Sequence, residues 1–99
     1  MDLPLEYELQ IFLIVREALV NVSTHSGATS VHLTVERSDG RYAFTVEDNG
    51  AGCGNSPADG HYGMMIMRER ALRIGGEVLV ESFAGLGTRV RLIFPVPAA

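Results

Sequence analysis

The sequence predicts an α+β fold, a two-layer α/β sandwich in which helices pack on one face of a mixed, mostly antiparallel sheet. The apolar period changes along the chain in the order helix, strand, strand, loop, helix, strand, strand. Short turns join neighbouring strands, which favours antiparallel pairing. The chain has 99 residues, 46% of them hydrophobic and 20% charged, so we expect one globular domain over residues 1–99.

The first expected element is a helix over residues 5–25. Pro4 suits the first turn, and acidic residues that complement the helix dipole follow it. Apolar residues recur at helical spacing and predict the apolar side of this helix. They are Phe12, Val15, Leu19 and Val22. Gly27 suits the C-cap position.

A hairpin is expected next. Val31, Leu33 and Val35 alternate with polar residues, which is typical of a half-buried strand. The segment Ser38–Gly40 has turn chemistry, and residues 42–47 form the second strand.

The second half begins with a glycine-rich loop over 48–60, and its length suggests a lid at about residues 50–62. A second helix is expected over 63–74, stopped by two glycines. Two further strands follow, over 77–83 and 88–94.

Composition excludes several classes of function. The net charge is −4 and no basic stripe is present, so nucleic acid is not expected as a partner. The chain has no Lys, which excludes the phosphate-binding P-loop. Gly50, Gly52 and Gly54 lead into more loop instead of a helix, which argues against a dinucleotide-binding turn. The lone Cys53 fits a reducing compartment.

Polar residues on the first helix could carry chemistry. Glu17 and Asn21 are four residues apart and share a face, which Thr24 and His25 continue. Carboxylate and amide oxygens are ligands that Mg²⁺ prefers. The alternative is an ordinary solvated face of an amphipathic helix.

Three glycine-containing segments could bind a nucleotide. Asp48 at a strand end, followed by Gly50 and Gly52, could accept a hydrogen bond from an exocyclic amine, although the segment also suits a plain turn. The segment 60–64 precedes the second helix, whose free amides could bind phosphate. The segment 85–88 is either a tight hairpin or part of an adenine pocket.

The order of these segments resembles the ATPase superfamily that includes DNA gyrase, Hsp90, histidine kinases and MutL, with its Bergerat fold. Residues 16–21 with His25 resemble its N box, and 48–52 resemble its first glycine box. Residues 60–64 resemble its second, and 85–88 its final glycine-threonine element. The Met-Arg-Glu-Arg-Ala run at 67–71 is similar to histidine kinases of the nitrate/nitrite-sensor class.

The resemblance implies a role for each matching residue. Asn21 would bind Mg²⁺, and Glu17 would act as the catalytic base or polariser near the γ-phosphate of ATP. Asp48 would bind the adenine amino group. The other implied ATP-binding residues are His25, Gly50, Gly52, His61, Gly63, Met64, Gly87 and Thr88. Gly63 and Met64 would present amides at a helix start. The family commonly has Lys where this chain has Thr24.

The resemblance also implies an activity. The domain would bind Mg-ATP and donate the γ-phosphoryl to a histidine on a separate dimerisation and phosphotransfer domain, with a response regulator downstream. It would be the cytoplasmic part of a membrane-bound sensor, without contacting the membrane itself. Because the acceptor domain is absent, the isolated chain is not expected to autophosphorylate. The alternatives are an anti-sigma-factor-like serine kinase and a non-catalytic nucleotide-binding or interaction module.

Overall fold

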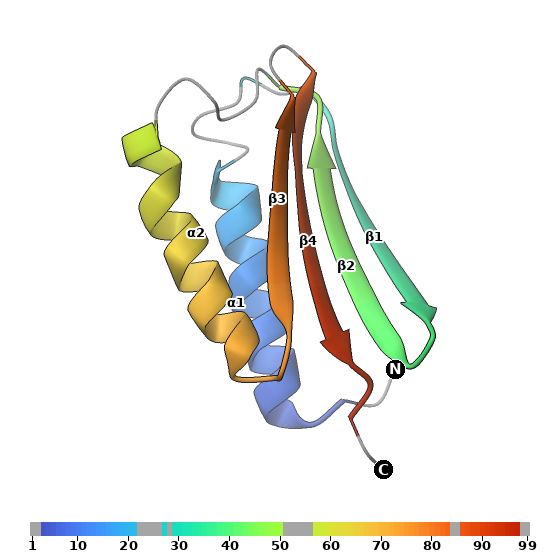
Figure 1. Ribbon diagram of the computed structural model, residues 1–99. Helices are drawn as coiled ribbons and strands as arrows, with labels where there is room; N and C mark the ends of the chain where they lie inside the picture. The colour runs from blue at the N-terminus through green and yellow to red at the C-terminus, as the bar shows by residue number, and fades with distance from the viewer. Residues whose placement is uncertain (1–2, 22–26, 28, 51–56, 84–85, 98–99) are drawn as a thin grey trace.

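The computed structural model describes residues 3–21, 27, 29–50, 57–83 and 86–97, and it has two layers (Figure 1). Helices α1 (Leu5–Asn21) and α2 (Pro57–Leu72) lie side by side on one face of a four-stranded sheet. The strands are β1 (Val31–Ser38), β2 (Arg41–Asp48), β3 (Glu77–Phe83) and β4 (Gly87–Pro95). Their order is β1-β2-β4-β3, and all three pairings between these strands are antiparallel. The predicted α/β sandwich is therefore confirmed.

The β1–β2 hairpin closes through two residues. Ser38 pairs with Arg41, while Asp39 and Gly40 both have positive φ, at 54° and 75°. Two consecutive positive φ angles characterise a type I′ turn, whose twist matches that of the flanking strands. The turn predicted from the sequence is thus confirmed, and it fixes the hairpin register.

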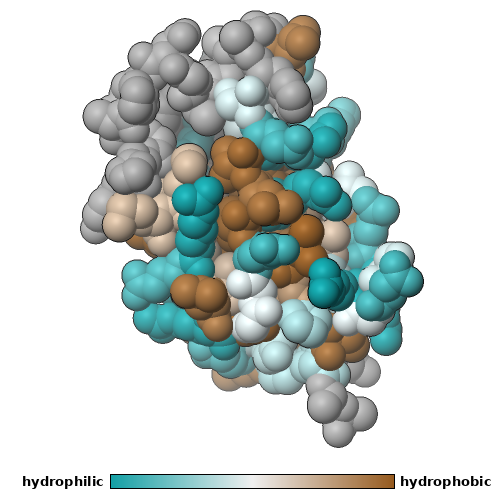
Figure 2. Space-filling view, in the orientation of Figure 1, coloured by the Kyte–Doolittle hydropathy of each residue, from teal (hydrophilic) through white to brown (hydrophobic). Residues whose placement is uncertain are grey.

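The core lies between the helices and strands β2, β4 and β3. Phe94 of β4 is 1% exposed, and its ring lies 5.5 to 5.8 Å from those of Tyr7, Tyr42 and Phe44. Aromatic rings at this separation add to the stabilisation from apolar burial. Apolar side chains also gather in the middle of the face shown in Figure 2. Phe94 therefore joins the first helix to the two central strands.

The apolar side predicted for the first helix was wrong in most of its residues, although Val15 packs partly buried against the core. The buried residues of α1 are Gln10, Ile11, Ile14 and Ala18. Phe12 is 62% exposed and Leu19 is 40% exposed, while Val22 lies outside the described residues. Helix α1 is apolar at many neighbouring positions, so several stripes have helical spacing and periodicity alone does not select the buried one.

Strand β1 also differs from its prediction. It was expected to be half-buried, but all eight of its residues are exposed. Val31, Leu33 and Val35 pair with Asp48, Val46 and Phe44 of β2, which places them on the side of the sheet that carries the core. The two helices cover the other three strands, so this edge strand keeps its apolar face in solvent.

Helix α2 begins earlier than expected, at Pro57 instead of residue 63. Proline is well suited to a first helical position, whereas glycine within a helix costs about 1 kcal/mol, so Gly60 and Gly63 had suggested a later start. The helix ends at Leu72, two residues before the expected end, and the two glycines predicted to stop it follow in a turn. Gly75, at φ 68°, donates to the Leu72 carbonyl, and Gly76 donates to the Ala71 carbonyl, which forms a Schellman motif.

The segment expected to form a lid, at about residues 50–62, overlaps the start of α2. Residues 57–62 belong to α2, and residues 51–56 lie outside the described part of the chain.

In the part of the chain that the structure describes, no helix is both long and apolar enough to cross a membrane.

Candidate functional site

Four element ends meet at one end of the molecule (Figure 1). Helices α1 and α2 run in opposite directions, so the end of α1 lies beside the start of α2. The end of β2 and the start of β4 lie at this same end. The fold therefore brings together the four segments that carry the candidate nucleotide-binding residues.

At this end, Glu17 of α1 lies against Gly63 of α2. A Cβ atom built on Gly63 would lie 2.6 Å from Glu17 Oε1 and 3.6 Å from Asn21 Nδ2. The carboxylate and the amide of α1 therefore face the glycine of α2, which leaves room for them. Both side chains are half-buried. This arrangement fits a role beyond that of a solvated helix face.

The helix ends give this region two opposite partial charges. The last turn of α1 has no basic residue, so the negative end of its dipole is not neutralised by a nearby cation of the helix itself. The start of α2 has the positive end and free backbone amides. A cation near Asn21 and an anion near the start of α2 would both be stabilised, which suits a metal-phosphate ligand.

Glu17 and Asn21 fit a magnesium ion chemically. Mg²⁺ binds oxygen ligands and retains several water molecules, so one amide oxygen and a nearby carboxylate suffice from the protein. The Glu17 carboxylate and the Asn21 amide both lie beside Gly63, so they belong to one small region between the helices that could hold such an ion.

Asp48 is held at the end of β2. Its Oδ1 accepts a hydrogen bond from the Gly50 amide at 2.8 Å, and its side chain is half-buried. Gly87, at φ 117°, lies so close to the Asp48 carbonyl that a side chain on residue 87 would collide with it. Only glycine fits both the backbone angle and this contact. The structure thus joins two segments that are almost forty residues apart.

Asn49 is a residue whose role the sequence did not reveal. Its Oδ1 accepts hydrogen bonds from the Thr29 and Ser30 amides at 2.9 and 3.0 Å, and its Nδ2 donates to Thr29 Oγ1 at 2.9 Å. The Asn-Gly pair had indicated only a turn. The side chain in fact ties the end of β2 to the residues that precede β1.

The structure describes only some of the remaining predicted site residues. Thr88 is half-buried and pairs with Ser82, and Met64 is a partly buried neighbour of the core. His61 lies in α2, while His25 and Gly52 lie outside the described residues. The expectation that Gly63 and Met64 open a helix was wrong, because six helical residues precede Gly63. Gly63 instead lies within α2, next to Glu17.

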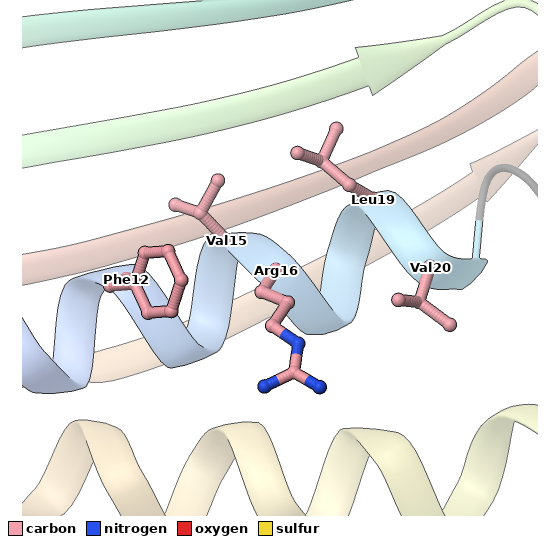
Figure 3. Close-up of a pocket in the computed structure, with 5 residues that line it drawn as sticks. All are labelled: Phe12, Val15, Arg16, Leu19 and Val20. Atoms are coloured by element: carbon pink, nitrogen blue, oxygen red, sulfur yellow. The ribbon is translucent and has the colours of Figure 1, made fainter.

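An apolar groove lies elsewhere on α1. It is lined by Phe12, Val15, Arg16, Leu19 and Val20. Val15 and Leu19 project from the same side of the helix (Figure 3). This groove has one cation and no carboxylate, so it is not a candidate for the metal-phosphate chemistry described above.

Comparison with known proteins now identifies the family. Residues 6–98 match the model of the "histidine kinase-, DNA gyrase B-, and HSP90-like ATPase" family. This chain belongs to that family. The match covers all four segments that the sequence analysis compared with the boxes of this family.

The curated relatives of this ATPase domain include two sensors of Escherichia coli. The chain is 38% identical to the nitrate/nitrite sensor protein NarQ and 39% identical to NarX, over 93% and 92% of its own length. It spans only 17% and 15% of those proteins. The similarity therefore concerns one domain of much longer sensors.

Solved structures agree with this assignment. The histidine kinase domain of a blue-light-activated kinase from Erythrobacter litoralis superposes with a TM-score of 0.82 at 31% identity, over 97% of this chain and 48% of that one. The ATP-binding domain of PrrB from Mycobacterium tuberculosis gives 0.76 at 26% identity, over 91% and 69%. The two-layer fold is thus that of histidine kinase ATP-binding domains.

Proposed function

We propose that this chain binds Mg-ATP as the catalytic domain of a two-component sensor histidine kinase. The observation that carries the proposal is the contact of Glu17 and Asn21 with Gly63, at the same end of the molecule as Asp48 and Gly87. Family membership supports a nucleotide as the ligand. Asp48 would accept a hydrogen bond from the adenine amino group, next to Gly50, Gly52, Gly87 and Thr88.

The phosphates would lie nearer to the helices. Asn21 would hold a magnesium ion that neutralises phosphate charge, and Glu17 would polarise the group that attacks the γ-phosphoryl. His25, His61, Gly63 and Met64 would line the phosphate side. Catalysis of phosphoryl transfer depends mainly on positioning and electrostatic stabilisation, which a small rigid domain with these groups can supply.

The γ-phosphoryl would pass to a histidine of a separate dimerisation domain and leave ADP behind. A response regulator would take it in the next step. The relatives NarQ and NarX are named as sensors and are far longer than this chain, which supports an acceptor outside the domain. Within a complete sensor, the domain would work on the cytoplasmic side of the membrane.

Calorimetric titration tests nucleotide binding. Mg-ATP is titrated into the wild type, into Asp48→Ala and into Glu36→Ala, which removes a carboxylate from the exposed strand β1. We expect heat with the wild type and with Glu36→Ala, and at least tenfold weaker binding with Asp48→Ala. Absence of heat with the wild type would refute nucleotide binding, and equal affinity of Asp48→Ala would refute its adenine role.

Incubation with radiolabelled ATP tests whether the acceptor histidine lies on a separate domain. The isolated chain has three histidines, His25, His32 and His61, and none is proposed as an acceptor. We expect no acid-labile label on the isolated chain. Label on any of these histidines would contradict a separate acceptor domain.

A further inference from the structure

Gln10 is an unusual residue at the contact between the helices. It is 1% exposed, and it is one of two buried polar residues among those the structure describes, the other being Thr45 on β2. A buried amide without partners costs about 1–3 kcal/mol. Both ends of this amide are satisfied, because Oε1 accepts from Arg70 Nη1 at 3.4 Å and Nε2 donates to Glu6 Oε1 at 3.1 Å.

The Gln10–Arg70 contact joins α1 to α2 at the end away from the candidate site. Glu17 is seven residues after Gln10, and Gly63 is seven residues before Arg70. Seven residues are about two turns, or about 10 Å, along each axis. Because the helices run in opposite directions, the hydrogen bond and the Glu17–Gly63 contact belong to one register of the pair.

A change in this register would alter the residue that lies opposite Glu17. Residues three or four apart share a helix face, so a slip of α2 by one turn would place Ile66 or Met67 opposite Glu17, where even a Cβ atom approaches the carboxylate to 2.6 Å. Burial of Ile14 and Met67 favours this register, and the Gln10–Arg70 hydrogen bond adds a contact that depends on the direction of approach. Single buried polar residues fix register in other helix pairs for this reason.

We propose that Gln10 and Arg70 are positioning residues for the nucleotide site. Their hydrogen bond sets the register of α1 against α2 and so holds Glu17 and Asn21 against Gly63. The inference rests on the proposed function only for its effect on nucleotide binding, since the placement of Gly63 is measurable in the nucleotide-free protein.

The experiment compares Gln10→Met, Arg70→Met and the double variant with the wild type. The readouts are the amide chemical shift of Gly63 without ligand, the thermal midpoint, and the affinity for Mg-ADP. We expect each single variant to shift the Gly63 amide and to weaken Mg-ADP binding at least fivefold. The double variant should be no worse than either single one, because both remove the same contact.

Two further variants separate positioning from general stability. The double variant Glu6→Gln/Gln10→Glu keeps both hydrogen bonds, because the new carboxylate at position 10 accepts from Arg70 and from the new amide at position 6, so it should restore the Gly63 shift and bring the affinity within twofold of wild type. Thr45→Val removes the other buried polar group, on the sheet, and should leave both readouts unchanged even if the midpoint moves.

An unchanged Gly63 shift in Gln10→Met would overturn the proposal, whether or not nucleotide binds. A shift that appears equally in Thr45→Val would also overturn it. Failure of the wild type to bind Mg-ADP would instead refute the proposed function. The Gly63 shift would still show whether Gln10 and Arg70 set the register of the two helices.

Discussion

Replacement of Gly63 by alanine separates stability from nucleotide binding. The added Cβ would lie 2.6 Å from Glu17 Oε1, whereas ordinary contacts begin at 3.4 Å, so the carboxylate must move by about 0.8 Å. The end of a flexible side chain can move at small cost. Alanine within a helix is favoured over glycine by about 0.5–1 kcal/mol. We therefore expect Gly63→Ala to keep the stability of the wild type or to exceed it.

The displaced carboxylate should nevertheless weaken binding. Hydrogen bonds to charged groups contribute about 1.5–3 kcal/mol, which corresponds to a loss of roughly 10- to 100-fold in affinity for Mg-ATP. Thermal unfolding and calorimetric titration on the same preparation measure both effects. A change of 1 kcal/mol moves the midpoint of a domain this size by about 4–8 °C.

A second glycine provides the control. A Cβ on Gly76 would meet the Ile93 carbonyl oxygen at 2.6 Å and Phe94 Cβ at 2.9 Å, and these cannot swing away as a carboxylate can. Gly76→Ala should therefore lower the midpoint clearly. The reasoning is refuted if Gly63→Ala binds Mg-ATP as tightly as the wild type, or if it destabilises the protein as much as Gly76→Ala.

Two other predictions concern packing and the Asn49 contacts. Ile14→Ala should lower the free energy of unfolding by about 2–5 kcal/mol because Ile14 is 1% exposed. Phe12→Ala should lower it by less than about 1 kcal/mol because Phe12 is 62% exposed. Equal losses for the two variants in urea unfolding would show that the buried face of α1 is misassigned. Asn49→Ala removes hydrogen bonds to Thr29 and Ser30, so we expect the free energy of unfolding to fall by about 1–2 kcal/mol. We also expect weaker binding of Mg-ATP. An unchanged affinity in calorimetric titration would mean that Asn49 does not support the turn after Asp48.

Local patterns predicted most of the fold. The turn at Asp39 and the helix stop at Gly75 were found because positive φ angles restrict the residue type, and glycine or aspartate stood at those positions. The two features that went wrong depend on long-range packing. The buried side of α1 is chosen by the sheet and by α2, and the exposure of β1 follows from how far two helices reach across four strands.

The candidate site was predicted from the order of its boxes. The sequence did not predict the contacts between these segments. The approach of Gly63 to Glu17 and of Gly87 to Asp48 joins segments that are about forty residues apart, so no local spacing encodes it. Gln10 had one signal, a lone amide between Leu9 and Ile11, but the sequence did not show that Arg70 would lie opposite it.

Amide chemical shifts recorded during a titration with Mg-ADP show directly which residues the nucleotide affects. We expect the largest changes at Glu17, Asn21, Gly50, Gly63 and Thr88, which lie in α1, after β2, in α2 and in β4 at one end of the molecule. Changes confined to the groove around Phe12 and Leu19, or no changes at saturating Mg-ADP, would contradict this expectation.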